Sequence, residues 1–251
     1  MRKTFKTFTL AKRNMKEIVR DPLSLIFLIA LPLLLEVLFY CIFHDLTPQF
    51  DMKNLAPGIV VFSQSFLTLF TGLLIATDRN TAFLTRLYVC GARSHEFIFG
   101  YTIAMIPLTL VQTVLFFIVG GIIDPSILGV GMLRCIPIAL LSSILFIGLG
   151  ILFGSICSEK SIGGVSSAVI TGQSVLSGMW FPIEGLNPGM VTVMKCLPFK
   201  NATDVMRLAL TGGGDPVKDH LVPILIVAAY AVAALVGAIF AFRSKMRSKN
   251  T

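Results

Sequence analysis

Six long and continuous apolar segments constrain the fold of this chain more than any other feature of its sequence. Each segment is long enough to cross roughly 30 Å of hydrocarbon as a helix that rises about 1.5 Å per residue. A transmembrane β-barrel would instead show short segments in which apolar and polar residues alternate. We therefore expect an all-α, polytopic membrane protein with six transmembrane helices. The segments are Leu23–Phe43, Pro57–Ala76, Phe97–Ile123, Cys135–Cys157, Ile162–Phe181 and Leu221–Phe242.

The overall composition supports a membrane protein. Hydrophobic residues make up 55% of the 251 residues and charged residues 14%, with a mean hydropathy of +0.85, whereas a soluble domain carries more charge. The five cysteines are scattered and include no C-x-x-C pair, so their spacing predicts neither a disulfide framework nor a thiolate metal site. No internal repeat is visible, and we treat residues 1–251 as a single domain.

The distribution of Lys and Arg predicts how the helices are oriented. If the N-terminus lies in the cytoplasm, most of the 21 basic residues fall on the inner side of the membrane, as the positive-inside rule requires. We therefore expect a multi-pass protein of the plasma membrane with both termini in the cytoplasm. The net charge of +8 follows from this topology and does not indicate nucleic-acid binding, because the basic residues lie beside the apolar segments and form no single patch.

The N-terminal stretch carries an amphipathic pattern. Phe5, Phe8 and Met15 recur at near-helical spacing, and basic residues such as Lys12 lie between them. We expect a helix over residues 1–21 that lies in the inner membrane interface. The alternative is a positively charged tail that only sets the topology.

Several polar side chains lie within the apolar segments. A carboxylate at membrane depth, as at Glu36, is costly unless it is paired, protonated or in contact with water. Gln64, Thr68 and Thr71 fall on one helical face. Such residues either line a translocation path or hold helices together by hydrogen bonds, and the sequence leaves both possibilities open. The candidate path residues are Glu36, Gln64, Thr68, Thr71, Gln112 and Gln173.

The stretch between the fifth and sixth segments, residues 182–220, is too long for a turn and too rich in Pro and Gly for a transmembrane helix. It should form an extracellular loop with two short helices, at about Met190–Leu197 and Asn201–Leu210. Asn201 carries a side chain suited to an N-cap, and the second helix should end at the glycines that begin with Gly212.

Catalytic motifs are absent or incomplete. No Gly is followed by Lys, so the P-loop G-x-x-x-x-G-K-[ST] is missing and the chain should not bind ATP itself. His95-Glu96 begins a zinc-protease pattern, but Phe99 stands where the second His is needed. Gly212–Asp215 matches the G-x-G-D string of intramembrane aspartyl proteases without a second membrane aspartate. We expect neither an enzyme nor a resident cofactor or metal.

Three groups of residues, in order and at matching spacing, resemble the membrane-spanning permease of ABC-type exporters, in the type-2 class with six helices and a separate ATPase. The groups are Arg20-Asp21-Pro22 with Pro32; Asp78-Arg79, Leu84, Arg86-Leu87, Val89 and Gly100; and Ser177-Gly178, Phe181-Pro182, Leu197-Pro198, Asp204 and Arg207. The resemblance covers nearly the whole chain. The sequence departs from the family pattern at Ala82-Phe83 (Gly-Thr in the family), Gly91 (proline) and Tyr101 (lysine).

The resemblance implies that residues 77–97 form a cytoplasmic coupling loop whose helix inserts into a cleft of a separate ATP-binding subunit. The cleft would bury the apolar side chains of the loop and pair with its arginines. The alternative is a basic helix that rests on anionic lipid, where each charge contributes about 1 kcal/mol. The expected contact residues are Asp78, Arg79, Phe83, Leu84, Arg86, Leu87, Tyr88 and Arg93. The extracellular motif of the family corresponds to Phe181, Pro182, Pro198, Asp204 and Arg207.

By the same resemblance, the chain is expected to be the permease subunit of an ATP-driven exporter in a bacterial inner membrane. Two copies, or one copy with a close homologue, would assemble with two ATPase subunits that bind ATP and Mg²⁺. The 20 Phe residues and few intramembrane charges favour a lipophilic or amphipathic cargo. Such cargo includes a drug, as in multidrug efflux, an antibiotic, a peptide or a lipid-linked glycan. An alternative function is a stand-alone secondary transporter or channel that uses Glu36.

Overall fold

The computed structural model describes residues 2–81, 83, 94–181 and 186–248. Within these ranges the regular structure is helical, which confirms the all-α fold class. The α-helices are α1 (Arg2–Val19), α2 (Pro22–Leu25), α3 (Leu31–Phe43), α4 (Met52–Asn80), α6 (Ser94–Ile123), α7 (Val130–Ile156), α8 (Glu159–Leu176), α9 (Pro188–Cys196), α10 (Pro198–Thr211) and α11 (Val222–Ser248). The short segments are the π-helices η1 (Ile26–Ala30) and η4 (Pro216–Leu221) and the 3-10 helices η2 (Pro48–Phe50) and η3 (Pro125–Ile127).

Five helical segments in the described ranges are long and apolar enough to cross a membrane. They are Ile26–Phe43, Met52–Asn80, His95–Ile123, Val130–Ile156 and Val217–Phe242. The predicted span at 162–181 is not among them, so the count of six is not confirmed. The helix at this place, α8, begins with Glu159 and Lys160 and is rich in Gly, Ser and Thr, which lowers its hydropathy. Its 18 residues are still roughly 27 Å long as a helix.

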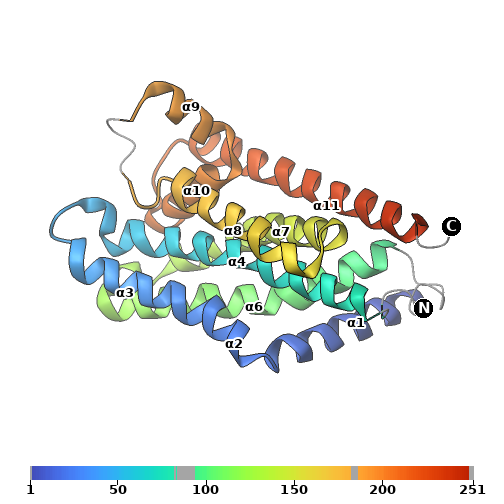
Figure 1. Cartoon of the computed structure of the whole chain (residues 1–251). Coiled ribbons are helices and arrows are strands. Elements are labelled where there is room, and N and C mark those ends of the chain that lie inside the picture. The colour runs from blue at the N-terminus through green and yellow to red at the C-terminus, as the bar shows by residue number, and fades with distance from the viewer. Residues whose placement is uncertain (1, 82, 84–93, 182–185, 249–251) are drawn as a thin grey trace.

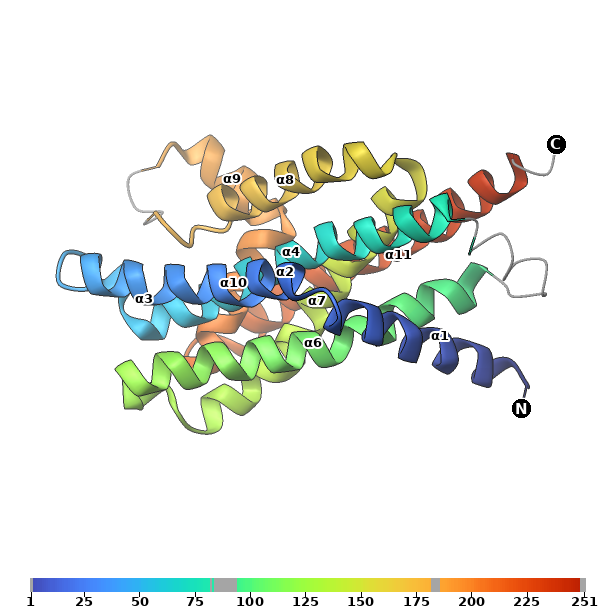
Figure 2. The ribbon, with the colours of Figure 1, turned by 60° about the horizontal axis from the view of Figure 1, so that its bottom comes forward.

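Helix α4 forms the centre of the bundle. Of its most apolar 18-residue window 83% is buried, compared with 17% for the span Ile26–Phe43 at the periphery. It packs against α3, α6, α7, α8 and α10, and the long helices form one bundle (Figures 1 and 2). The closest approach is to α7, because a Cβ atom at Gly150 would lie 2.8 Å from the carbonyl oxygen of Thr68 and one at Gly154 would lie 2.7 Å from that of Gly72. The absence of a side chain at these two α7 positions therefore permits the close packing of α4 and α7.

Both termini lie at the same end of the bundle as the adjoining ends of α4 and α6 (Figure 1). Helix α9 and the C-terminal end of α3 lie at the opposite end. The predicted coupling loop at 77–97 is shorter than expected, because α4 continues to Asn80 and α6 begins at Ser94. At the end of α4, the polar residues from Thr77 to Asn80 have partners inside the chain, which favours the continuation of this helix past the apolar segment.

Helix α1 lies along the first turns of α6 (Figure 2). Its buried side includes Leu10 and Ile18, whereas Phe8 is 67% exposed. The helix that the periodicity predicts is therefore present as α1, and it packs on α6 through Leu10, which is not part of the expected apolar stripe, while Phe8 of that stripe stays exposed. The close contact uses Gly100, where a Cβ atom would lie 2.7 Å from Cδ2 of Leu10.

The two short helices predicted between the fifth and sixth segments are α9 and α10. Helix α10 starts at Pro198, earlier than expected, because proline is suited to the first helical position. Asn201 is therefore not an N-cap; its side chain donates to the carbonyl oxygens of Lys195 (2.8 Å) and Leu197 (2.6 Å) and ties α10 to the end of α9. Gly212 ends α10 with a φ of +75°, as the C-terminal glycine predicts.

Candidate functional site

The base of the connection between α4 and α6 is held by the carboxylate of Asp78. This residue lies in the last turn of α4 and is only 1% exposed. Its Oδ2 atom is 2.5 Å from Nη1 of Arg13 on α1 and accepts a hydrogen bond from the hydroxyl of Tyr101 on α6 at 2.5 Å. A buried carboxylate needs such charge-assisted partners, because burial without them is costly. Asp78 therefore joins three helices at one point.

Arg13 connects this network to the start of the loop. Its guanidinium also contacts Glu17 at 2.7 Å, and it lies 4.3 Å from the centre of the Phe83 ring. Burial lowers the pKa of Arg13, but the hydrogen bond and the charge of Asp78 raise it by more, so that the net shift is upward. The guanidinium is therefore charged at any ordinary pH, and the ion pair with Asp78 does not depend on titration of Arg13.

Arg79 fastens the end of α4 to the end of α7. Its Nη1 atom donates to the carbonyl oxygen of Ser155, and its Nη2 atom donates to that of Cys157. The last carbonyl groups of a helix lack intrahelical donors and carry partial negative charge. A guanidinium at this position satisfies two of them and holds α4 against α7.

Glu159, in the first turn of α8, completes the contacts at this end. Its carboxylate accepts hydrogen bonds from Thr77 Oγ1 at 3.2 Å and from Asn80 Nδ2 at 2.7 Å. The last turn of α4 is thus linked to α1, α6, α7 and α8. We call Arg13, Asp78, Arg79, Tyr101 and Glu159 the anchor cluster.

Asp78 and Arg79, which the family resemblance assigns to ATPase contact, have side-chain partners within the chain. Phe83 is half-buried beneath Arg13. The other predicted contact residues lie outside the described residues; they are Leu84, Arg86, Leu87, Tyr88 and Arg93. Sequence reasoning missed Arg13, Tyr101 and Glu159. Of these three residues, only Tyr101 is marked in the sequence, because it stands after Gly100 where the family has lysine.

Two of the predicted path residues on α4 serve helix packing. Gln64 donates from Nε2 to the carbonyl oxygen of Ala139 at 3.0 Å and accepts from the hydroxyl of Ser142. Thr68 donates to the carbonyl oxygen of Phe146 at 3.0 Å. These bonds to α7 match the helix-packing interpretation of the polar face.

Gln112 on α6 supplies a hydrogen-bond donor at the point where Pro32 interrupts the backbone hydrogen bonds of the first span. Pro32 has no N–H to give to the carbonyl group of Leu28, four residues earlier. Nε2 of Gln112 donates to this oxygen at 2.9 Å.

Gln173 on α8, the third glutamine among the predicted path residues, is fully buried, and neither polar atom of its side chain has a hydrogen-bond partner among the described residues.

Glu36 on α3 is fully buried, and neither carboxylate oxygen has a hydrogen-bond partner among the described residues. A Cβ atom at Gly120 on α6 would lie 3.0 Å from its Oε1 atom, so the carboxyl group rests directly on the α6 backbone. Thr71 on α4 likewise has a buried hydroxyl without a partner. Glu36, Thr71 and Gln173 are thus the path residues whose polar groups are not used in packing.

At the opposite end of the bundle, Arg207 on α10 links the start of α4 to the turn at Gly178, which belongs to the extracellular family motif. Its Nε atom donates to the carbonyl oxygen of Asn54 at 3.0 Å, and its Nη1 atom lies 3.5 Å from that of Gly178. Asp204 is paired with Lys200. Pro198 is buried at the start of α10, Phe181 is 54% exposed, and Pro182 lies outside the described residues.

A groove lies at the end of the bundle that carries the anchor cluster, between α1, the start of the first span and α4. Its volume is about 310 Å³. Leu25, Leu28, Phe70, Leu73 and Leu74 form most of its wall, with Glu17, Asp21 and Thr77 also in the lining. This apolar groove, with a few polar groups in its lining, therefore lies beside the anchor cluster.

Comparison with known families gives one match. The sequence model of a family described as ABC-2 type transporter matches residues 6–211, which extend from α1 to the end of α10. No curated protein matches the chain. The matched range contains the anchor cluster, the apolar groove and Arg207.

Proposed function

Because this chain belongs to the ABC-2 type transporter family, we propose that it is the permease subunit of an ATP-driven exporter. A permease of this family is a multi-pass membrane protein that associates with an ATP-binding subunit. Export, two ATPase copies that bind ATP and Mg²⁺, and the bacterial inner membrane are parts of our proposal. The observation that carries it is the anchor cluster, which ties the last turn of α4, where the connection to α6 begins, to α1, α6, α7 and α8.

The anchor cluster supports a lever mechanism. A force on residues 81–93 would act first on Asp78 and Arg79, and through them on α1, α6 and α7. Because α4 packs against most of the other helices, it cannot move without them. Closure of ATPases bound at this end would therefore move α4 and its neighbours together and switch access to the membrane path. In this mechanism Asp78 and Arg79 transmit the movement, and the residues from Phe83 to Arg93 contact the ATPase.

The apolar groove supports a lipophilic or amphipathic cargo. Its wall of Leu and Phe side chains would bury hydrocarbon, and Glu17 and Thr77 would remain beside a polar headgroup. A small inorganic ion would gain nothing from such a wall. The path from this groove would pass the polar groups that packing leaves unused, at Glu36, Thr71 and Gln173.

The free face of α8 supports a second permease subunit. Among the described residues, no atom lies within 4 Å of the position of a Cβ atom at Gly163, Gly164 or Gly172, and Ser167 and Thr171 on this helix are exposed. Small residues permit close helix–helix approach in a membrane. We place α8 across the membrane as a sixth helix, with a second copy or a close homologue covering its polar and small residues.

Reconstitution tests this proposal. The chain should co-purify with the ATP-binding subunit encoded beside it, and lipophilic compounds should stimulate ATP hydrolysis by the complex in liposomes. Failure of every neighbouring ATP-binding subunit to co-purify would overturn the proposal. An ATPase complex that responds only to small ions would retain the partner and reject the cargo class.

A second candidate function, a gradient-driven secondary transporter, is favoured by Glu36. A fully buried carboxyl group with no hydrogen-bond partner is suited to bind and release a proton or a cation during transport. In this case transport would proceed without an ATPase and would require the carboxyl group of Glu36.

A further inference from the structure

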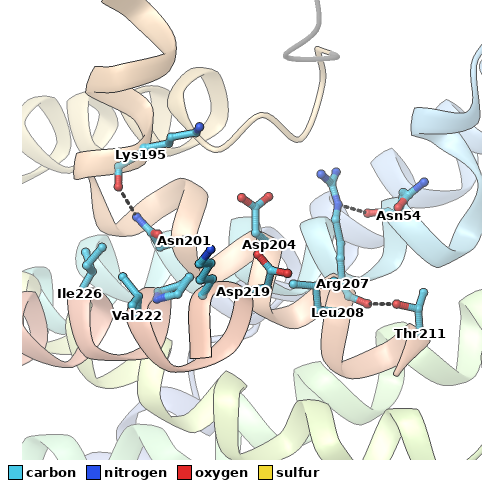
Figure 3. A pocket seen from close by; sticks show the side chains of 12 residues that line it. Asn54, Lys195, Asn201, Asp204, Arg207, Leu208, Thr211, Asp219, Val222 and Ile226 are labelled. Atoms are coloured by element: carbon cyan, nitrogen blue, oxygen red, sulfur yellow. Dashed lines mark hydrogen bonds between the residues drawn. The ribbon is translucent and has the colours of Figure 1, made fainter. Parts of the chain in front are cut away.

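A second pocket lies at the end of the molecule opposite the anchor cluster. It has a volume of about 650 Å³ and is formed by α10, the end of α9 and the start of the last span (Figure 3). Three cationic side chains line it from three different elements: Lys195 on α9, Arg207 on α10 and Lys218 on η4. We call this the cationic pocket.

The two acidic residues in the lining are already engaged inside the chain. Asp204 forms an ion pair with Lys200, and Oδ2 of Asp219 accepts a hydrogen bond from the backbone N–H of Asp215 at 2.7 Å. Both carboxylates keep their charge, and that of Asp204 also acts on Arg207. The lining nevertheless holds three cations against two carboxylates, and Asp204 is shared with Lys200 outside the lining.

The three cationic side chains, in contrast, still have donor groups without an acceptor among the described residues. Lys195 and Lys218 are exposed, and their ammonium groups make no hydrogen bond or ion pair with any described residue. Arg207 uses its Nε atom, but its Nη2 atom is buried and has no partner in the described part of the chain. Arg207 thus provides a fixed positive charge in the wall, and the two lysines can move to meet a ligand. An anion, best a phosphoryl group with several acceptor oxygens, matches this arrangement.

The opposite wall of the cationic pocket is apolar. Val222 and Ile226 line it from α11, and Val222 is 47% exposed. These residues belong to the span Val217–Phe242, so the apolar wall continues into the membrane-crossing part of the chain. A ligand that contacts both walls has an anionic head and a hydrocarbon tail.

We propose that the cationic pocket binds the phosphoryl group of an anionic amphiphile, with Lys195 and Lys218 as mobile contacts, Arg207 as the fixed charge, and Val222 and Ile226 against the tail. The site lies outside the groove beside the anchor cluster and goes beyond the proposed function. Its test requires no ATPase, so its failure and the failure of the proposed function are distinguishable.

Lipid titration followed by native mass spectrometry tests the site. The full chain in neutral detergent is titrated with dioleoyl phosphatidylglycerol and, separately, with the zwitterionic dioleoyl phosphatidylcholine. We expect the first lipid to bind at lower concentration. The double variant Lys195→Gln/Lys218→Gln should weaken phosphatidylglycerol binding by about tenfold or more, since each cation near an anionic surface contributes measurably to binding.

The matched control is Lys53→Gln, which removes an exposed lysine at the same end of the molecule but outside the pocket. It should bind phosphatidylglycerol as the wild type does. Equal binding of the two lipids, wild-type affinity in the double variant, or an equal loss in Lys53→Gln would overturn the proposal. If the double variant does not elute as a monodisperse protein, Lys218→Gln alone is judged by the same criterion.

Two further measurements distinguish a membrane lipid from a free phosphate. Inorganic phosphate at millimolar concentration is added as a competitor, and Ile226→Ala removes part of the apolar wall. Competition by phosphate with no effect of Ile226→Ala indicates a soluble phosphate ligand. Weaker phosphatidylglycerol binding in Ile226→Ala without phosphate competition indicates a lipid. The first outcome retains the phosphoryl contact but overturns the tail contact with Ile226, the second supports the whole proposal, and absence of both effects contradicts it.

Discussion

Arg13 on the first helix and Asp78 at the end of the central helix form an ion pair across 65 residues of sequence, with the carboxylate almost completely buried. The pair places the amphipathic N-terminal helix in direct contact with the base of the α4–α6 connection. A shift of α1 therefore changes the environment of Asp78, and a pull on the connection acts on α1.

Removal of the Asp78 carboxylate should destabilise the protein. Asp78→Ala leaves the guanidinium of Arg13 and the hydroxyl of Tyr101 without their shared acceptor. We expect a loss of about 2 kcal/mol, below the value for a fully buried pair because Arg13 is partly exposed to solvent. Thermal unfolding in detergent measures the change. The control Asp45→Ala, which removes an exposed carboxylate near the other end of the bundle, should leave the midpoint unchanged; equal midpoints for both variants would argue against the anchor cluster.

The contact between α1 and α6 can be tested by a substitution and its rescue. Gly100→Ala places a methyl group 2.7 Å from Cδ2 of Leu10, so we expect a destabilisation of about 1 kcal/mol from overpacking. The double variant Gly100→Ala/Leu10→Ala should lose less stability than the sum of the losses in the two single variants, because Leu10→Ala removes the side chain that the new methyl group would meet. The four midpoints of this cycle measure the coupling, and strict additivity would show that the two helices do not touch there.

Arg79 should be sensitive even to a change that preserves its charge. Arg79→Lys retains the positive charge near the end of α7 but cannot donate from two nitrogens to the carbonyl oxygens of Ser155 and Cys157 together. We expect a loss of about 1 kcal/mol, corresponding to one net hydrogen bond. Limited proteolysis in the stretch that joins α7 to α8 should become faster. Unchanged proteolysis and stability would indicate that Arg79 does not cap α7.

Glu36→Gln separates the two candidate functions. The carboxyl oxygens have no hydrogen-bond partner in the described part of the chain, so an amide of the same shape should leave the thermal midpoint unchanged or raise it. ATP-driven transport by the reconstituted complex should continue, with an altered substrate preference at most. Abolished transport in a stable protein, with gradient-driven uptake by the wild type in the absence of ATPase, would identify the secondary transporter instead.

The sequence was most informative where one physical effect dominates. Burial of a whole helix in hydrocarbon requires a continuous apolar segment, and the segments that contain α4, α6, α7 and α11 were recognised on that basis. Gly212 marked the end of α10, because glycine permits the left-handed conformation found there, whereas the start was expected at Asn201 and lies at Pro198. Helix α8 was expected as a span by length, but its glycines and hydroxyl residues keep its hydropathy below that of the others.

The anchor cluster could not be predicted from the sequence, because its partners are distant and some of them are backbone atoms. The guanidinium of Arg79 meets carbonyl oxygens 76 and 78 residues away, and a carbonyl group has no signature in a sequence. The pattern of α1 shows that the helix is amphipathic but not which residues the bundle covers, so it does not identify Arg13 as the partner of Asp78. The sequence therefore predicted an external protein partner for the whole coupling loop at 77–97. In the structure, Asp78 and Arg79 have partners inside the chain.

The central claim is that the connection between α4 and α6 carries the contact with an ATP-binding subunit, and site-specific photocrosslinking tests it most directly. A benzoylphenylalanine replaces Tyr88 in the connection or, as the control, Leu46, which is 70% exposed near the opposite end of the bundle. We expect an ATP-dependent crosslink to the ATP-binding subunit from position 88 and none from position 46. A crosslink from position 46, or none from position 88 in a complex that hydrolyses ATP, would contradict it.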